Sequence, residues 1–195
     1  MRSLRKAIPH QKRILAAEEA VKHLLREPLF EQSERIGCYV ASPEEFDCSL
    51  IIEAIRQLKK KCYLPIISKS QEKFLEFAEY NKHDELKPNQ FQILEPINTP
   101  VISPAALDLV IAPLVGFDSQ GNRLGMGAGF YDRTFSFLNI NINKKKETKP
   151  ILIGLGYQSQ QIAELPREPW DVRLQAVLTE KGFYSFFEGD HTHPV

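Results

Sequence analysis

One short stretch of this chain gathers side chains that together could bind a phosphorylated ligand. It holds four glycines within nine residues, two arginines, two aromatic residues and an aspartate: Gly121, Arg123, Gly125, Gly127, Gly129, Phe130, Tyr131, Asp132 and Arg133. Glycines let backbone N–H groups approach an anion, and arginine holds phosphate oxygens. A carboxylate holds magnesium, and an aromatic face holds a flat ring. The stretch therefore predicts a phosphate site.

Two common nucleotide motifs do not describe this loop. It lacks the Lys-Ser/Thr ending of a P-loop, and its glycines follow the pattern G-x-G-x-G, because Phe130 stands where the dinucleotide fingerprint needs its last glycine. The alternative interpretation is a tight turn in which glycine relieves crowding. The flanking arginines and Asp132 favour the phosphate site.

The elements around the loop have the order of a phosphate-binding edge. Leu109 to Ala112, closed by Pro113, is a short apolar run typical of a strand buried on both faces. Leu114 to Phe117 continues it, and residues 118–121 supply a turn. Phe130 to Leu138 should be helical, so that the start of a helix faces the loop and adds its partial positive charge.

The rest of the chain alternates between expected strands and helices. Strands are predicted at Ile36–Ala41, Cys62–Ile67, Ile151–Leu155 and Leu174–Thr179, and helices at His10–Arg26 and from Asp47 or Ser49 to Lys60. Pro65 favours an edge or irregular place for its strand. Glu72–Tyr80 fits either a helix or a strand, and Asn81–Pro104 reads as a polar, proline-punctuated surface excursion. This alternation predicts a three-layer α/β/α single domain with a largely parallel sheet, whose ligands bind at the carboxyl ends of the strands.

Composition excludes several other classes of protein. The 195 residues suffice for one domain with its own core, and 25 basic and 25 acidic residues give a formal net charge of zero, which argues against general nucleic-acid binding. Cys38, Cys48 and Cys62 form no CxxC pair and are expected to be buried thiols in a reducing compartment. The five histidines lack zinc spacing. No apolar run reaches the length of a membrane span and no secretory signal is evident, so we expect a cytoplasmic protein. We also expect a monomer, with a polar tail from about residue 188.

The sequence RLGMGAGFYDR following DLVIAPLVGFD closely resembles the signature of the 5-formyltetrahydrofolate cyclo-ligase family. The resemblance runs from Arg2 to LTEKG near Gly182, and it includes FQILEP beside the family's FGILEP and PWDVRLQAVLTE beside PHDVPLDAIVTE. It favours a short strand within Glu72–Tyr80. It also implies conversion of 5-formyltetrahydrofolate and ATP to 5,10-methenyltetrahydrofolate, ADP and phosphate, with Mg²⁺.

The resemblance implies which residues form the nucleotide and metal sites. The nucleotide site would comprise Arg2, Arg5, Arg123, Leu124, Gly125, Met126, Gly127, Ala128, Gly129, Phe130 and Tyr131. Arg123, Tyr131 and Asp132 would be catalytic, with Asp132 holding the metal. The family's N-terminal Lys-x-x-x-Arg pair is matched at Arg5, but its lysine falls on Met1, so Arg2 would substitute. Gln175 replaces an aspartate that relatives associate with metal, and an amide binds Mg²⁺ less well than a carboxylate does.

For the folate, the resemblance implies contacts by Val40, Glu45, Met126 and Phe130. An ionised Glu45 suits a pterin, whose amino and ring N–H groups are donors, because a carboxylate offers two acceptor oxygens. The alternative is that Glu45 only solvates a loop. At the level of function, two alternatives are a different kinase or ligase that uses the same phosphate loop, and a folate-binding module without turnover.

Overall fold

The computed structural model of the chain describes residues 2–142 and 149–186, without the side chains of residues 2, 3 and 140–142. Met1, the predicted polar tail from about 188 and most of the connection at 139–149 lie outside the described residues. The thiols of Cys38, Cys48 and Cys62 are buried and free, as predicted. No helix in the described ranges is long and apolar enough to cross a membrane.

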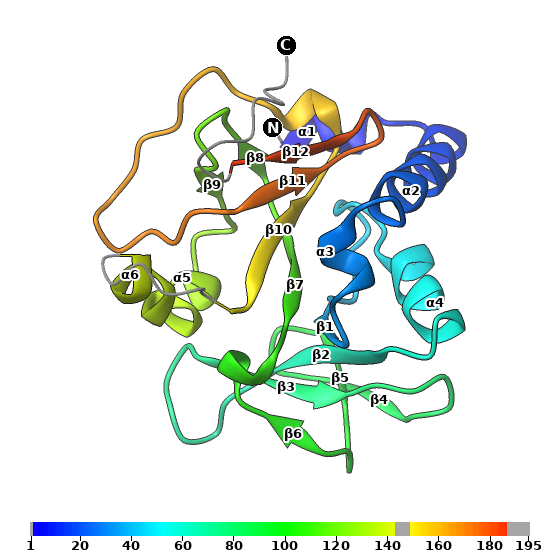
Figure 1. The fold of residues 1–195 in the computed structure, drawn as a ribbon, viewed down its shortest axis with the longest axis vertical. Coiled ribbons are helices and arrows are strands. Elements are labelled where there is room, and N and C mark those ends of the chain that lie inside the picture. The colour runs from blue at the N-terminus through cyan, green and yellow to red at the C-terminus, as the bar shows by residue number, and fades with distance from the viewer. Residues whose placement is uncertain (1, 143–148, 187–195) are drawn as a thin grey trace.

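A central sheet organises the molecule (Figure 1), and its strands lie in the order β12-β11-β10-β7-β1-β2-β3-β6. Their bounds are β1 Arg35–Gly37, β2 Lys61–Ile67, β3 Leu75–Glu79, β6 Val101–Ile102, β7 Leu109–Pro113, β10 Ile151–Leu155, β11 Ala176–Leu178 and β12 Phe183–Ser185. The five strands from β11 to β2 pair in parallel, whereas β12, β3 and β6 add antiparallel edges. The largely parallel sheet is thus confirmed.

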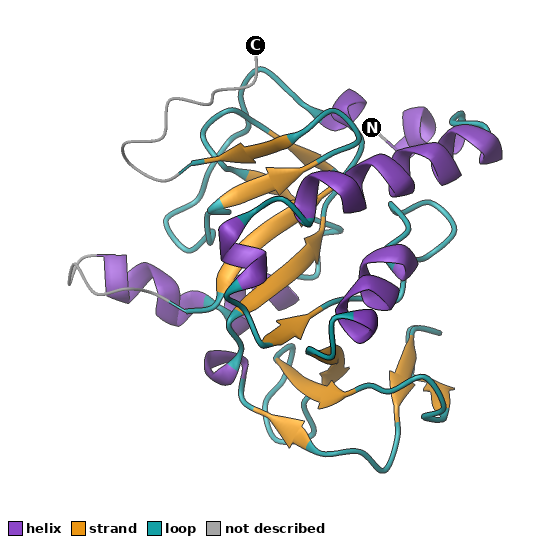
Figure 2. Ribbon diagram, turned by 45° about the vertical axis from the view of Figure 1, so that its right-hand side comes forward, coloured by secondary structure: helices purple, strands orange, loops and turns teal. Residues whose placement is uncertain are grey.

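Helices cover both faces of this sheet, as Figures 1 and 2 show. The helices are α1 Arg2–Lys6, α2 His10–Leu24, α3 Pro28–Glu31, α4 Ser49–Gln57, α5 Phe130–Thr134 and α6 Ser136–Ile142, with 3₁₀ turns at Pro104–Ala106 and Gln158–Gln160. The second, third and fourth helices lie on one face, and α5 and α6 lie on the other. The predicted three-layer α/β/α arrangement is confirmed.

Strand β7 shows why its sequence is apolar without alternation. Leu109 and Ile111 belong to the core cluster that includes residues of α2 and α4, whereas Val110 belongs to the cluster on the α5 and α6 face. All three side chains are fully buried. Because successive side chains of a strand point to opposite faces, a strand covered on both faces must be apolar at every position.

Two smaller sheets lie outside the central one, and one of them was not predicted. The segment expected as a surface excursion carries the hairpin of β4 (Leu86–Pro88) and β5 (Leu94–Pro96), followed by the edge strand β6. The turn of this hairpin is closed by Asn89, whose Oδ1 accepts hydrogen bonds from the N–H groups of Phe91 and Ile93. Polar, proline-containing strands escape a search for apolar periodicity. The other small sheet pairs β8 (Gly116–Phe117) with β9 (Arg123–Leu124).

Several element boundaries also differ from prediction. Strand β3 confirms the strand interpretation of Glu72–Tyr80, but β12 was not predicted, and the expected helix at Phe130–Leu138 is divided at Phe135. Pro65, for which an edge or irregular place was predicted, lies in an inner strand. Its strand pairs with β1 only as far as Tyr63, so Pro65 has a ladder partner on the β3 side alone. A missing N–H is tolerated there for the same reason as at an edge.

Asp108 ties together the strands at the end of the sheet where β1 and β7 begin. Its Oδ2 accepts hydrogen bonds from the backbone N–H groups of Glu34 (3.2 Å) and Arg35 (2.9 Å), and its Oδ1 accepts one from Lys149 Nζ at 3.1 Å. Burial alone would raise the pKa of Asp108, but the hydrogen bonds from Arg35, Lys149 and Glu34 outweigh it and lower the pKa to about 2.

We expect Asp108→Asn to lower the free energy of unfolding by about 2 kcal/mol at pH 7, since the depressed pKa measures the preference of the folded state for the carboxylate. That contribution is complete above the ordinary carboxyl pKa and is lost as the pH falls towards about 2. Urea unfolding at pH 7, 5 and 3 should show the difference between wild type and variant shrinking with acid. A difference that does not change with pH would assign the effect to geometry instead of charge.

Candidate active site

The glycine loop connects β9 to α5 and is open where a ligand would lie. A Cβ built on Gly125 or on Gly127 meets no atom of the described chain within 4 Å. A Cβ on Gly121 would lie 2.7 Å from the Leu174 carbonyl oxygen, and one on Gly129 would lie 2.5 Å from Arg133 Nη1. Crowding by the protein therefore explains Gly121 and Gly129, as a tight turn would, but not the two glycines between them.

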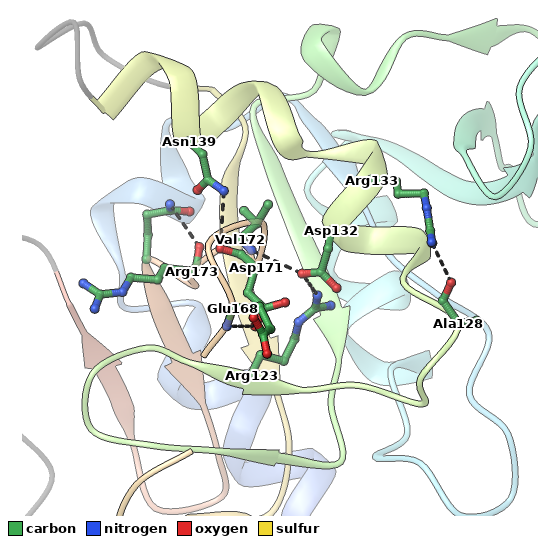
Figure 3. Close-up of polar contacts among 10 residues, drawn as sticks. Arg123, Ala128, Asp132, Arg133, Asn139, Glu168, Asp171, Val172 and Arg173 are labelled. Atoms are coloured by element: carbon green, nitrogen blue, oxygen red, sulfur yellow. Dashed lines mark hydrogen bonds and ion pairs between the residues drawn. The ribbon is translucent and has the colours of Figure 1, made fainter. Parts of the chain in front are cut away.

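Arg133, which flanks the loop, supports it from within. Its Nη1 donates a hydrogen bond to the Ala128 carbonyl oxygen at 2.8 Å (Figure 3). Gly129 has a φ of 70° and precedes α5, a left-handed backbone conformation that glycine adopts without strain. This contact assigns Arg133 to holding the loop.

Arg123 and Asp132 face each other across the base of the loop (Figure 3), and both are largely shielded from water. Arg123 Nη2 donates to Asp132 Oδ1 at 2.8 Å, and only 6% of the Arg123 side chain is exposed. The Val172 N–H also donates to Asp132 Oδ1, at 3.2 Å. The Arg123 Nε is buried and lacks a protein partner. This ion pair accordingly keeps donor capacity for a ligand.

Tyr131 packs against the arginine of this pair. The Arg123 guanidinium lies 5.2 Å from the centre of the Tyr131 ring, and the Tyr131 hydroxyl is buried without a protein partner. Burial raises the pKa of Tyr131, Arg123 lowers it and the Glu45 carboxylate raises it, and the net pKa lies well above the ordinary value. Tyr131 thus stays a neutral O–H donor.

Val40 and Glu45 line a cavity of about 420 Å³ between the sheet, α2 and α4. A cavity of this size accommodates a ligand as large as a folate. The Glu45 carboxylate accepts a hydrogen bond from the Ser42 N–H at 2.8 Å through Oε2, and the Glu45 N–H donates to the Ser42 carbonyl. The turn after β1 therefore fixes the position of this acid.

Arg5 is the N-terminal residue of the predicted site that the structure places most clearly. It is only 1% exposed, yet its Nε and Nη1 have no protein partner. Its backbone carbonyl accepts a hydrogen bond from Arg13, which also donates to the Pro43 carbonyl in the loop that carries Glu45. A buried guanidinium with unmet donors fits an anion. The side chain of Arg2 lies outside the described residues.

The remaining predicted residues lie at the mouth of the site. Leu124 is 42% exposed and Met126 is 59% exposed, while Ala128 serves the loop through its carbonyl. Phe130 packs edge-to-face against Phe91, with ring centres 6.0 Å apart. The sequence analysis had placed FQILEP only within a surface excursion and had not singled out Phe91. The hairpin of β4 and β5 brings it over the loop.

Two residues at which the sequence suggested a metal role, Gln175 and Asp132, have different surroundings in the structure. The Gln175 Oε1 accepts a hydrogen bond from the Leu152 N–H at 2.7 Å. Within residues 2–142 and 149–186, no three side chains of histidine, cysteine, aspartate or glutamate converge as metal ligands. Asp132 is the predicted acid beside the loop. Both of its hydrogen bonds go to Oδ1, so Oδ2 can serve a cation, as suits Mg²⁺ bound through one carboxylate and phosphate oxygens.

Comparisons with known proteins identify the family of the chain. The chain is 36% identical over 165 residues to the 5-formyltetrahydrofolate cyclo-ligase of Haemophilus influenzae, covering 84% of each chain. It is 32% identical over 181 residues to that of Escherichia coli K12, covering 92% of this chain and 96% of the relative. The 5,10-methenyltetrahydrofolate synthetase of Aquifex aeolicus superposes with a TM-score of 0.79 at 25% identity, over 98% of this chain and 92% of that one. A sequence model of the 5-formyltetrahydrofolate cyclo-ligase family matches residues 1–180, and the chain belongs to this family.

Proposed function

We propose that the chain catalyses the ATP- and Mg²⁺-dependent cyclisation of 5-formyltetrahydrofolate to 5,10-methenyltetrahydrofolate, with release of ADP and phosphate. Membership of the cyclo-ligase family supports the reaction. The observation that carries the proposal is the open glycine loop, which lies beside the buried, unpartnered Nε of Arg123 and hydroxyl of Tyr131. The cavity lined by Val40 and Glu45 offers space for a second substrate. These two features support binding of a phosphate donor and of a folate.

The reaction requires activation of a poor electrophile. The formyl oxygen attacks the γ-phosphorus of ATP, the bond from that phosphorus to the bridging oxygen breaks, and ADP leaves. N10 then attacks the carbon of the resulting iminium phosphate, loses its proton, and the C–O bond breaks to release phosphate. The oxygen of the formyl group ends in the phosphate. The protein forms no bond to the substrate, so positioning and charge neutralisation dominate.

The described residues supply those two effects. Backbone groups at Gly125 and Gly127 would approach the phosphates, because no side chain occupies the space beside them. Arg123 and the buried Arg5 would neutralise the transferred charge through their unpartnered nitrogens. The neutral Tyr131 hydroxyl would donate a hydrogen bond to an oxygen of the reacting groups.

Asp132 would hold Mg²⁺ directly or through water, and the ion would neutralise charge on the phosphates. Its hold on Arg123 would at the same time keep the guanidinium beside the loop. On the folate side, Glu45 and Val40 would contact the pterin, with Met126, Phe130 and Phe91 at the entrance.

The near-ultraviolet absorbance of methenyltetrahydrofolate tests the proposal. Purified protein is mixed with 5-formyltetrahydrofolate and Mg²⁺, with and without ATP, and phosphate release is measured in parallel. ATP-dependent growth of the absorbance with matching phosphate would establish the reaction. Folate binding without turnover would identify a binding module, and phosphate transfer only to other acceptors would identify a different kinase or ligase.

Replacement of the acid in the cavity tests the folate half-site. We expect Glu45→Gln to raise the KM for 5-formyltetrahydrofolate by about tenfold, since a charged acceptor is lost, and to leave the KM for ATP unchanged. The amide oxygen can still accept from the Ser42 N–H, so the turn should persist. Steady-state kinetics with each substrate varied in turn gives both constants. A larger rise in the ATP constant would move Glu45 to the nucleotide side.

A further inference from the structure

The cavity that holds Glu45 also contains an arginine whose hydrogen-bonding capacity is unmet. Arg56, near the end of α4, lines the cavity, and its Nε and Nη2 are buried without a protein partner. Its nearest acid is Glu53, whose Oε2 lies 3.8 Å from Nη1, too far for a hydrogen bond. The guanidinium carbon lies 4.6 Å from the centre of the Tyr80 ring, which also lines the cavity. The ring positions the charge but accepts none of its N–H bonds.

The two unpartnered nitrogens of Arg56 could bind one ligand group together. Nε and Nη2 lie along one edge of the guanidinium, and their N–H bonds point in the same direction, so that together they fit the two oxygens of a carboxylate. Leaving such donors buried and unpaired costs free energy. A small rotation of the guanidinium into the cavity would let an anionic ligand remove that cost.

The other arginine that lines the cavity is already engaged. All three side-chain nitrogens of Arg13 donate to backbone carbonyls, those of Ile8, Pro43 and Arg5. Arg13 therefore acts as a clamp between the N-terminal segment and the loop that carries Glu45. The free capacity for an anion in this cavity lies at Arg56.

The residues that line the cavity differ in character from the start of α4 to its end. Ser49, Ile52 and Arg56 line it from one face of α4, and the rise over the seven steps from Ser49 to Arg56 is about 10 Å. Glu45 and Asp47 lie at the start of this helix, Ile52 and Leu86 give apolar wall, and Arg56 with Tyr80 lies at the far end. A ligand that uses the whole cavity presents donors at one end, an apolar middle and an anion at the other.

We propose that Arg56, stacked on Tyr80, binds a carboxylate of the glutamyl group of 5-formyltetrahydrofolate. This inference rests on the proposed function, because the pterin, the aminobenzoyl ring and the glutamyl carboxylates supply those three features in that order. The phosphates of ATP are not the anion in question, since the glycine loop at 125–129 does not line this cavity. Arg56 is thereby a specificity residue for the tail of the substrate.

A cycle of protein and substrate changes tests the assignment. Wild type and Arg56→Gln are each assayed with 5-formyltetrahydrofolate and with 5-formyltetrahydropteroate, which lacks the glutamyl group. We expect removal of the tail to lower kcat/KM of the wild type by about tenfold or more, as loss of a charged hydrogen bond does. On the complete substrate, kcat/KM of Arg56→Gln should be lower than that of the wild type by a similar factor. On the truncated substrate, the variant and the wild type should have nearly equal kcat/KM. Arg56→Lys, which keeps the charge without the paired edge, should recover only part of the loss.

Several outcomes would overturn the inference. Equal losses on tail removal in wild type and Arg56→Gln would show that Arg56 does not contact the tail. Equal kcat/KM of the wild type on the two substrates would also overturn the inference. This comparison uses no variant, so misfolding of a variant cannot explain its result. The control Arg26→Gln removes an exposed charge just beyond α2 and should match wild type on both substrates. Cyclisation by the wild type is measured in the same assay. If it occurs, these outcomes concern Arg56 alone, whereas no cyclisation at all would contradict the proposed function itself.

Discussion

Gly125→Val is expected to raise the KM for ATP about 100-fold while the melting temperature of the protein stays unchanged, because the added side chain enters space that only a ligand would use. A Cβ at this position has no neighbour within 4 Å in the described chain, and Gly125 is not among the glycines with a positive φ. The substitution therefore strains neither packing nor backbone. Steady-state kinetics with ATP as the varied substrate and thermal unfolding of the same sample measure the two quantities.

Two neighbouring glycines provide the comparison. Gly127→Val should also block the phosphates, but its φ of 94° adds backbone strain of about 1–2 kcal/mol, so its melting temperature should fall as well. Gly121→Ala should lower stability alone, because its Cβ would lie 2.7 Å from the Leu174 carbonyl oxygen. An unchanged KM for ATP in Gly125→Val would show that the loop is only a tight turn and does not bind phosphate.

The pattern of apolar residues was enough to predict the layers of this fold. Leu109–Pro113 and Ile151–Leu155 are continuous apolar runs because helices cover both faces of the sheet, and such runs can be recognised in the sequence. The hairpin at Leu86–Pro96 could not be predicted, because its strands are polar, contain proline and depend on the side chain of Asn89. Strands of this kind form through local hydrogen bonds that leave no apolar period.

The candidate site was predictable by residue type but not by role. The glycines, arginines and Asp132 could be chosen because their chemistry suits phosphate. Their division into ligand-facing and structural groups could not, since it depends on what lies beside each one. Arg133 turns back to the Ala128 carbonyl, whereas Arg123 keeps a free Nε.

Arg56 is a residue whose proposed role could not be predicted from the sequence. In the sequence it is one cation near the end of a helix, a position that usually means only a favourable interaction with the helix dipole. Its significance comes from the Tyr80 ring and from a cavity whose other wall is supplied by α2, far away in the chain. Contacts of this range follow from the packing of the layers and not from any local pattern.

Asp132→Asn should lower kcat/KM for ATP by about 100-fold and raise the Mg²⁺ concentration for half-maximal activity by about tenfold or more, since a neutral amide is a poor Mg²⁺ ligand. The amide oxygen can still accept from Arg123 and from the Val172 N–H, so the local geometry should persist. Titration of activity with Mg²⁺ at saturating ATP gives the second quantity. Asp171→Asn is the matched control, because among the residues that the structure describes the Asp171 carboxylate accepts a hydrogen bond only from the Glu168 N–H of the neighbouring turn.

The Mg²⁺ titration of Asp132→Asn also separates the two roles that the structure allows this acid. Asp132 is both the predicted metal ligand and the partner of Arg123, whose side chain is only 6% exposed and would otherwise carry an unpaired charge. A metal role requires the activity of the variant to rise again with added Mg²⁺. A kcat that stays low at every Mg²⁺ concentration, with an unchanged half-saturation point, would contradict the metal role. It would leave Asp132 as the residue that aims Arg123 at the transferred phosphoryl group.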